Sequence, residues 1–182
     1  MFGLGWLRAL TDARGLLEHA HHGVPRLGEG YTTDDNARAL LYLSLLPEGA
    51  RDEGLVRTYL AFLLHMQKED GRFRNGLTLD GRFEDEGEAE DPTGRAVLAL
   101  AAAGARVAIV GRHAGRLAET VELAAQVAPR SRLLALQLDV CIPEQMQSMA
   151  DQVAQAFETI DVLVAAAGIG GMRIMLRYVE RV

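Results

Sequence analysis

Apolar residues in the first third of the chain recur every three or four positions, which is the spacing of a helix that buries one face. The pattern predicts helices over residues 6–20, 34–46 and 52–67. Thr33 or Asp34 is placed to cap the second of them. The buried face of the third is expected to consist of Leu55, Tyr59, Phe62, Leu63 and Met66.

Helical periodicity stops between residues 68 and 92, where glycines and charged residues dominate. Such a composition predicts a long surface loop. An acidic run ends this loop, and its members are Glu84, Asp85, Glu86, Glu88, Glu90 and Asp91. We interpret the acidic run as a solvated surface.

Helical and strand-like patterns alternate after Thr93. The predicted elements are helices over 94–103, 113–128 and 143–158 and strands over 106–110, 133–138 and 161–165. Continuous apolar strands between helices favour a parallel sheet covered by helices. The sequence therefore predicts an α/β protein. Residues 1–92 form a helical N-terminal half, and residues 93–182 form a parallel sheet of about three strands covered by helices.

The helix predicted over 143–158 begins with Pro143, which suits a first helical turn. Ile142 precedes it and has no side-chain oxygen to cap the helix. We expect this helix to bury one stripe, formed by Met146, Met149, Val153, Ala154 and Phe157.

Composition narrows the class of protein. The chain has 182 residues, 49% of them hydrophobic, with a net charge of −6, which is typical of a globular protein and opposes binding to nucleic acid. No apolar run is long enough to cross a membrane, and the N-terminus does not resemble a secretory signal. The single cysteine, Cys141, excludes an internal disulfide. These features predict a cytoplasmic protein.

Three histidines raise the question of a metal site. On the predicted first helix, His19 and His22 would share one face, with His21 beside them. That helix offers no convergent carboxylate, so we predict no metal site. The alternative is a group of surface histidines at the C-terminus of a helix.

Three stretches of the second half carry a specific pattern. They are Ala103–Arg112, Leu138–Val140 and Ile160–Gly168. On these motifs residues 94–171 resemble a short-chain dehydrogenase/reductase, a family with a Rossmann fold. The resemblance implies that Arg112 favours the 2′-phosphate of NADP and that Asp139 contacts the adenine amino group. It also implies that Ala165, Ala167 and Gly168 belong to the cofactor-binding turn at the end of the fourth strand.

The sequence departs from that family at two places. The acidic segment 88–93 stands where a glycine-rich turn should approach the pyrophosphate. The family also transfers hydride with a tyrosine and a lysine four residues later, whereas the only lysine here is Lys68, and Leu64 stands four residues before it. The sequence ends 14 residues after Gly168, and we expect no reductase chemistry and assign no catalytic residue. No cofactor is expected, although NADP is possible.

The departure has a consequence for the sheet. In the family's strand order, the missing first strand lies between the second and the fourth. Either the strand at 161–165 pairs directly with the one at 106–110, or an N-terminal segment fills the gap. Exposed strand edges favour a homodimer or another protein partner.

A second resemblance lies in the first half. Its motifs are Gly30–Arg38, Asp70–Asn75 and Glu90–Ala96. They are similar to part of a helical-toroid domain that is found with bacterial glycosyltransferases and is related to glycosidases. The resemblance implies that Asp34, Asp35 and Asn36 face a sugar-binding centre from a helix start. The alternative is that these three residues form a capping cluster.

Three functions follow from these patterns. The first is a non-catalytic chimera, natural or engineered, that acts as a protein-interaction scaffold and lacks a complete active site. The second is an NADP-binding protein related to the short-chain dehydrogenases. The third is a carbohydrate-binding helical domain.

Overall fold

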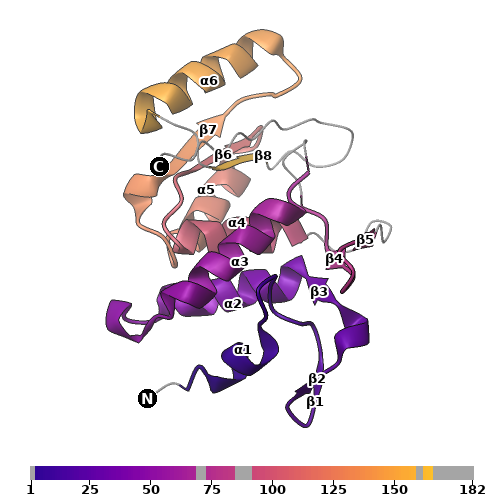
Figure 1. Ribbon diagram of the computed structural model, residues 1–182. Helices are drawn as coiled ribbons and strands as arrows, with labels where there is room; N and C mark the ends of the chain where they lie inside the picture. Colours follow the sequence, from indigo (N-terminus) through magenta and orange to yellow (C-terminus); the bar gives the residue numbers. More distant parts are fainter. Residues whose placement is uncertain (1–2, 69–72, 85–91, 159–161, 166–182) are drawn as a thin grey trace. The chain divides into compact units, whose positions relative to one another are not determined.

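The computed structural model describes residues 3–68, 73–84 and 92–158 and the backbone of 162–165 (Figure 1). Contacts within the chain divide these residues into two compact units. We call residues 3–68, 73–84 and 92–100 the helical unit, and the described residues from 101 onwards the sheet unit. Mixed α/β architecture was predicted, with helices first and a parallel sheet second, and the structure confirms it.

The helical unit is built from four α-helices and several short strands among the described residues. The helices are α1 (Gly5–Leu10), α2 (Thr33–Leu45), α3 (Glu53–Met66) and α4 (Pro92–Ala102), the last of which ends in the sheet unit. The strands are β1 (Ala20–His21), β2 (Val24–Pro25), β3 (Tyr31–Thr32), β4 (Gly76–Leu77) and β5 (Phe83–Glu84). Two 3-10 turns, Leu27–Glu29 and Glu48–Ala50, complete the unit.

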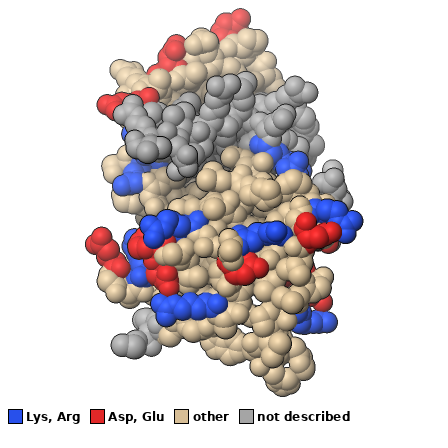
Figure 2. All heavy atoms as spheres, viewed as in Figure 1, with Lys and Arg blue, Asp and Glu red and all other residues tan. Residues whose placement is uncertain are grey.

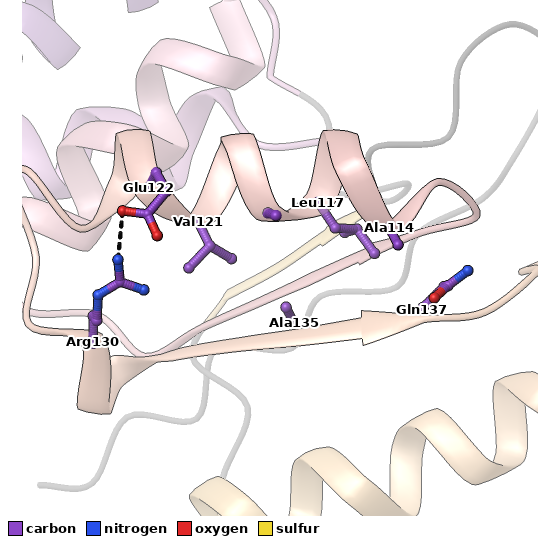
Figure 3. A pocket seen from close by; sticks show the side chains of 8 residues that line it. Ala114, Leu117, Val121, Glu122, Arg130, Ala135 and Gln137 are labelled. Carbon is purple, nitrogen blue, oxygen red and sulfur yellow. Dashed lines mark ion pairs between the residues drawn. The ribbon is translucent and has the colours of Figure 1, made fainter.

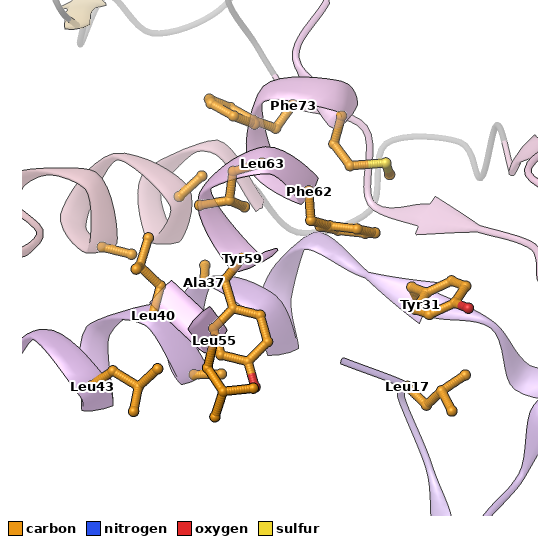
Figure 4. Close-up of a cluster of buried hydrophobic side chains, with 14 of the residues drawn as sticks. Leu17, Tyr31, Ala37, Leu40, Leu43, Leu55, Tyr59, Phe62, Leu63 and Phe73 are labelled. Carbon is orange, nitrogen blue, oxygen red and sulfur yellow. The ribbon is translucent and has the colours of Figure 1, made fainter. Parts of the chain in front are cut away.

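The core of the helical unit lies where α2 packs against α3 (Figure 4). All five residues predicted for the buried face of α3 are buried. Leu40 and Leu43 of α2 are fully buried against them, and Ala96 and Ala99 of α4 belong to the same cluster. Helical spacing therefore identified the α3 face correctly, because each of these side chains removes its apolar surface from water.

The helix predicted over residues 6–20 is wrong beyond Leu10. The Asp12 carboxylate accepts hydrogen bonds from the backbone N–H groups of Arg14 (2.8 Å) and Gly15 (3.1 Å) and turns the chain. A side chain at Gly15 would approach Asn36 Oδ1 to 2.8 Å, so this turn needs glycine. An aspartate whose side chain competes for backbone N–H groups outweighed the helical spacing.

The segment after this turn forms the β1–β2 hairpin. His22 (φ 49°) and Gly23 (φ 81°) occupy its two-residue loop with positive φ at both positions, as a type I′ turn requires. His19, His21 and His22 therefore do not share a helix face, and the interpretation of the histidines as a helix C-terminus is wrong.

The predicted loop over residues 68–92 is only partly a loop. Strands β3, β4 and β5 pair in that order as an antiparallel sheet. Phe73 and Leu77 are buried in the helical core, and Gly81 (φ 84°) turns the chain between β4 and β5. Strands of two residues give too little periodicity to reveal a hairpin. The acidic run from 85 onwards lies outside the described residues.

The sheet unit contains β6 (Val107–Gly111), α5 (Ala114–Ala124), β7 (Leu133–Gln137), α6 (Pro143–Phe157) and β8 (Val162–Ala165). A 3-10 turn, Arg130–Arg132, precedes β7. The strand order is β7-β6-β8 and both pairings are parallel, so β8 pairs directly with β6. This is one of the two arrangements that the sequence allowed.

One helix covers each face of this sheet. Met149, Val153 and Phe157 of α6 pack against the face that carries Ala108 and Leu136, and α5 lies over the other face (Figure 3). As predicted, Ile142 makes no capping bond to α6. Ala154 was predicted in the buried stripe but is exposed. The side chains that α6 packs against the sheet are those of Met149, Val153 and Phe157.

On the face shown in Figure 2, acidic and basic side chains lie beside one another over the helical unit. The ion pairs of this unit include Arg8 with Asp52 (2.9 Å) and Arg26 with Glu29 (3.3 Å). Among the described residues, none of the helices has the length and hydropathy to cross a membrane.

The turn at Asp12 should make the stability of the helical unit depend on acid. Partial burial of Asp12 opposes ionisation, but hydrogen bonds from the Tyr31 hydroxyl (2.6 Å) and two backbone N–H groups outweigh it and lower the pKa of Asp12. A lowered folded-state pKa stabilises the fold above the unfolded value, about 4, and this stabilisation is lost as the pH falls below it.

We expect Asp12→Asn to lower the free energy of unfolding at pH 7 by about 1.5 to 3 kcal/mol, which is the net value of a hydrogen bond to a charged group. The difference from the wild type should shrink as the pH falls from about 5 to 3. Urea titrations at several pH values would measure it. A difference that stays constant from pH 7 to pH 3 would contradict the role of the carboxylate.

Candidate functional site

The carboxyl ends of β6 and β7 form a small polar site. Arg112 directly follows β6, and Asp139 lies two residues beyond β7. Adjacent parallel strands place their carboxyl ends together, which is where open α/β sheets bind ligands. The structure accordingly brings these two predicted residues together, with Arg112 Nη1 4.0 Å from Asp139 Oδ2.

Backbone and amide bonds hold the two residues in place. Gln137 Nε2 donates to the carbonyl oxygen of Arg112 at 3.2 Å, and the N–H of Leu138 donates to Gly111 at 3.1 Å. The N–H of Asp139 donates to Oε1 of Gln145 at 2.5 Å. These hydrogen bonds therefore join the end of β6, which precedes Arg112, to the end of β7, which precedes Asp139.

The Asp139 carboxylate is charged at neutral pH. The backbone N–H of Cys141 donates to Asp139 Oδ1 at 2.9 Å, and this bond is the largest influence that lowers the pKa of Asp139. The Cys141 thiol and the charge of Arg112 also lower this pKa, whereas desolvation raises it. Because Oδ1 is occupied, Oδ2 is the oxygen that faces Arg112 and solvent.

The two side chains are accessible to a ligand. The Arg112 side chain is 54% exposed and that of Asp139 31% exposed. A guanidinium can bind a phosphate through two parallel hydrogen bonds, and a carboxylate oxygen can accept a hydrogen bond from an exocyclic amino group. The pair thus offers recognition of a phosphate and an amine, and no acid or base for proton transfer.

The predicted cofactor residues of the fourth strand lie partly outside the described residues. Ala165 ends β8 and pairs with Val110, which places its backbone at the same edge of the sheet as Arg112. Ala167 and Gly168 are outside the described residues.

A second feature of the sheet unit is a pocket of about 320 Å³ between α5 and β7 (Figure 3). Its lining consists of Ala114, Leu117, Ala118, Val121, Glu122, Arg130, Ala135 and Gln137. Glu122 and Arg130 close one end with an ion pair of 2.5 Å. Sequence reasoning missed this pocket. The available signal was the run of small side chains, alanines at three lining positions, where a larger residue would fill the space between helix and strand.

In the helical unit, the predicted carbohydrate residues begin α2. Thr32 caps this helix, because its Oγ1 accepts a hydrogen bond from the N–H of Asp35 at 3.2 Å and donates to the Asp35 carboxylate at 3.1 Å. The prediction of Thr33 or Asp34 as the cap is wrong. Thr33 is already within the helix, and its hydroxyl donates to the carbonyl oxygen of Arg74 at 2.5 Å.

Ion pairs occupy the Asp34 carboxylate. Arg38 lies 2.9 Å from its Oδ2, and Arg95 of α4 contacts its Oδ1. Phe73 N–H donates to the Thr93 hydroxyl at 3.1 Å, and Thr33 N–H donates to Asn75 at 2.8 Å. The three sequence motifs of the first half are therefore joined at the starts of α2 and α4.

Asn36 is fully buried and all its bonds are internal. Its Oδ1 accepts from Leu16 N–H at 2.8 Å, and its Nδ2 donates to the carbonyl oxygens of Leu16 (3.2 Å) and Thr32 (2.8 Å). This geometry favours the capping interpretation over a sugar-binding centre, because the polar atoms of Asn36 and the carboxylates of Asp34 and Asp35 bond the chain itself.

A metal site has no support in the described part of the chain, where no group of three histidine, cysteine or carboxylate side chains is placed to hold an ion. The histidines of the β1–β2 hairpin include an edge-to-face pair, His21 and His22, with ring centroids 4.2 Å apart.

Comparison with known proteins gives one finding for the second half. Residues 94–181 match the family model described as short chain dehydrogenase. This segment begins within α4 and includes strands β6, β7 and β8, so the sheet unit is similar to part of that family. Neither the curated proteins nor the solved structures include a significant match to the chain.

The capping interpretation makes a prediction about stability. Asn36→Leu should lower the free energy of unfolding by about 3 kcal/mol, because it removes the three hydrogen bonds that the buried Asn36 side chain makes to the backbones of Leu16 and Thr32. Chemical denaturation followed by circular dichroism would measure the loss. Arg57→Ala, at an exposed position of α3, is the control and should change stability by less than about 0.5 kcal/mol. A loss as small as that of the control would contradict a structural role for Asn36.

Proposed function

We propose that the sheet unit binds the adenosine end of NADP or NADPH, with Arg112 on the 2′-phosphate and Asp139 on the adenine amino group. The observation that carries the proposal is the pairing of these two side chains, 4.0 Å apart, at the carboxyl ends of adjacent parallel strands. The match of this segment to the short chain dehydrogenase family supports the choice of nucleotide.

The residues present suit one end of the cofactor. An exposed arginine matches a doubly charged phosphate ester, and Oδ2 of Asp139, which lies 4.0 Å from Arg112 Nη1, can also accept from an amine donor. At the other end, β8 lies directly beside β6, in the position where the family has the strand that leads into its glycine-rich turn. Recognition is therefore proposed for the adenosine 2′-phosphate and not for the pyrophosphate.

The proposal is for binding and not for hydride transfer. NADPH supplies a hydride in the family's reaction, with a tyrosine as the proton donor and a lysine that lowers the pKa of that tyrosine. The sequence has a single lysine, Lys68, and Leu64 stands four residues before it. Arg112 and Asp139 can orient a nucleotide, but neither is suited to protonate a carbonyl oxygen, since one is always charged and the pKa of the other is lowered.

Binding of fragments tests the proposal directly. We expect 2′,5′-ADP and NADPH to bind with affinities within about threefold of each other, and 5′-ADP to bind about 10- to 100-fold more weakly, the range for loss of a charged hydrogen bond. Isothermal titration calorimetry of the whole chain would measure all three.

Two substitutions sharpen this experiment. Arg112→Ala should weaken 2′,5′-ADP by about 10- to 100-fold and leave 5′-ADP nearly unchanged. Arg116→Ala is the matched control, since Arg116 is an exposed arginine in the first turn of α5. Equal losses of both nucleotides in Arg112→Ala would overturn the assignment of the phosphate. NADPH oxidation above background with a panel of carbonyl compounds would overturn the restriction to binding.

A further inference from the structure

Strand β7 has an open edge. Among the described residues it pairs with β6 alone. Leu138 N–H donates to Gly111 on the β6 side, and backbone direction alternates along a strand, so Leu134 and Leu136 also face β6. Leu133, Ala135 and Gln137 therefore direct their N–H and C=O groups away from the sheet, and of these groups the N–H of Leu133 donates to the carbonyl oxygen of Arg130.

This edge lacks the usual protection against pairing. The strand reads Leu-Leu-Ala-Leu-Gln, with no charge, proline or glycine, whereas exposed edges in monomeric proteins commonly carry lysine, proline or a bulge. The apolar pocket beside Ala135 adds uncovered apolar surface along the same edge. Both backbone and side chains are thus suited to receive another strand.

We propose that β7 pairs antiparallel with β7 of a second copy of this chain, with Ala135 opposite Ala135 on the two-fold axis. Only in this register does every outward-facing residue meet another one: Leu133 lies opposite Gln137, and Ala135 lies opposite itself. About four backbone hydrogen bonds would form, two between the Ala135 residues and two from Gln137 N–H to the carbonyl oxygen of Leu133, and the two sheets would join into one.

Side chains on the α5 face fit this arrangement. Helix α5 packs against both β6 and β7, and a helix centred over two strands that are about 4.8 Å apart has its axis about 2.4 Å inside the outer strand. The two-fold axis lies the same distance outside β7. The two α5 helices are then about 10 Å apart, within the usual range for packed helices, and the side chains between them are Ala114, Ala118 and Val121.

The opposite face of the sheet fits as well. Leu134 lies opposite Leu136 of the second copy, which continues the apolar layer under α6. A second copy therefore matches the edge in hydrogen bonding and in apolar surface.

Charge substitution at the axis tests the partner and the register together. Ala135 is exposed in the single chain, so Ala135→Glu and Ala135→Lys should leave the fold intact. Each variant alone places two like charges directly opposite each other and should raise the dimer dissociation constant at least about tenfold. An equimolar mixture should restore the dimer. Size-exclusion chromatography with light scattering would follow the mass, and circular dichroism would check the fold.

A disulfide tests the same contact independently. The chain has one cysteine, so Cys141→Ser gives a background without thiols. Ala135→Cys in this background should form a covalent dimer on mild oxidation, because residues in a hydrogen-bonded antiparallel pair lie about 5.5 Å apart between Cα atoms, within disulfide range. Ala156→Cys, at an exposed position of α6, is the matched control and should stay largely monomeric.

Three results would overturn the proposal. One is a wild-type chain that is monomeric at every concentration up to about 1 mM, which sets the weakest specific association of interest. Another is a dimer that both charge variants leave unchanged, which would place the interface elsewhere. The third is a mixture of the two charge variants that remains monomeric although each variant is folded.

Discussion

The sheet unit depends on the backbone pairing of β6 with a strand on each side. All five residues of β6 are buried, so each of its N–H and C=O groups needs a partner within the sheet. Strand β7 supplies partners on one side and β8 on the other. The direct contact with β8 fills the side of β6 opposite β7, so β6 is the central strand of the described sheet.

In the helical unit, hydrogen bonds and ion pairs between side chains and distant segments hold the chain together. The side chain of Asn36 fixes Leu16, the hydroxyl of Thr33 fixes Arg74, and Asp34 pairs with Arg95. These bonds join segments that are far apart in the sequence at the starts of two helices. Polar groups that recur in a motif can thus be explained by the hydrogen bonds that the chain makes to itself, without a ligand.

The sequence predicted the regular parts of this structure well and the local turns poorly. Helical spacing located α3 and its buried face, and apolar runs located β6 and β7, because burial of repeating side chains dominates in such elements. The hydrophobic pattern did not predict the turn at Asp12, whose carboxylate turns the chain after α1. It also did not predict β4 and β5, which are too short for a repeat. Arg112 and Asp139 were placed together through a family pattern, whereas the α5–β7 pocket depends on small side chains that no motif marks.

Helix α4 belongs to two descriptions of the chain at once. By sequence it opens the segment that matches the short chain dehydrogenases, which starts at residue 94, while by packing its Ala96 and Ala99 complete the core around α2 and α3. A cut at the family boundary would therefore remove two buried side chains from the helical core and leave their former neighbours facing water. The two segments cannot be separated at that point into self-sufficient fragments, so the junction behaves as an integrated part of the fold and not as a linker.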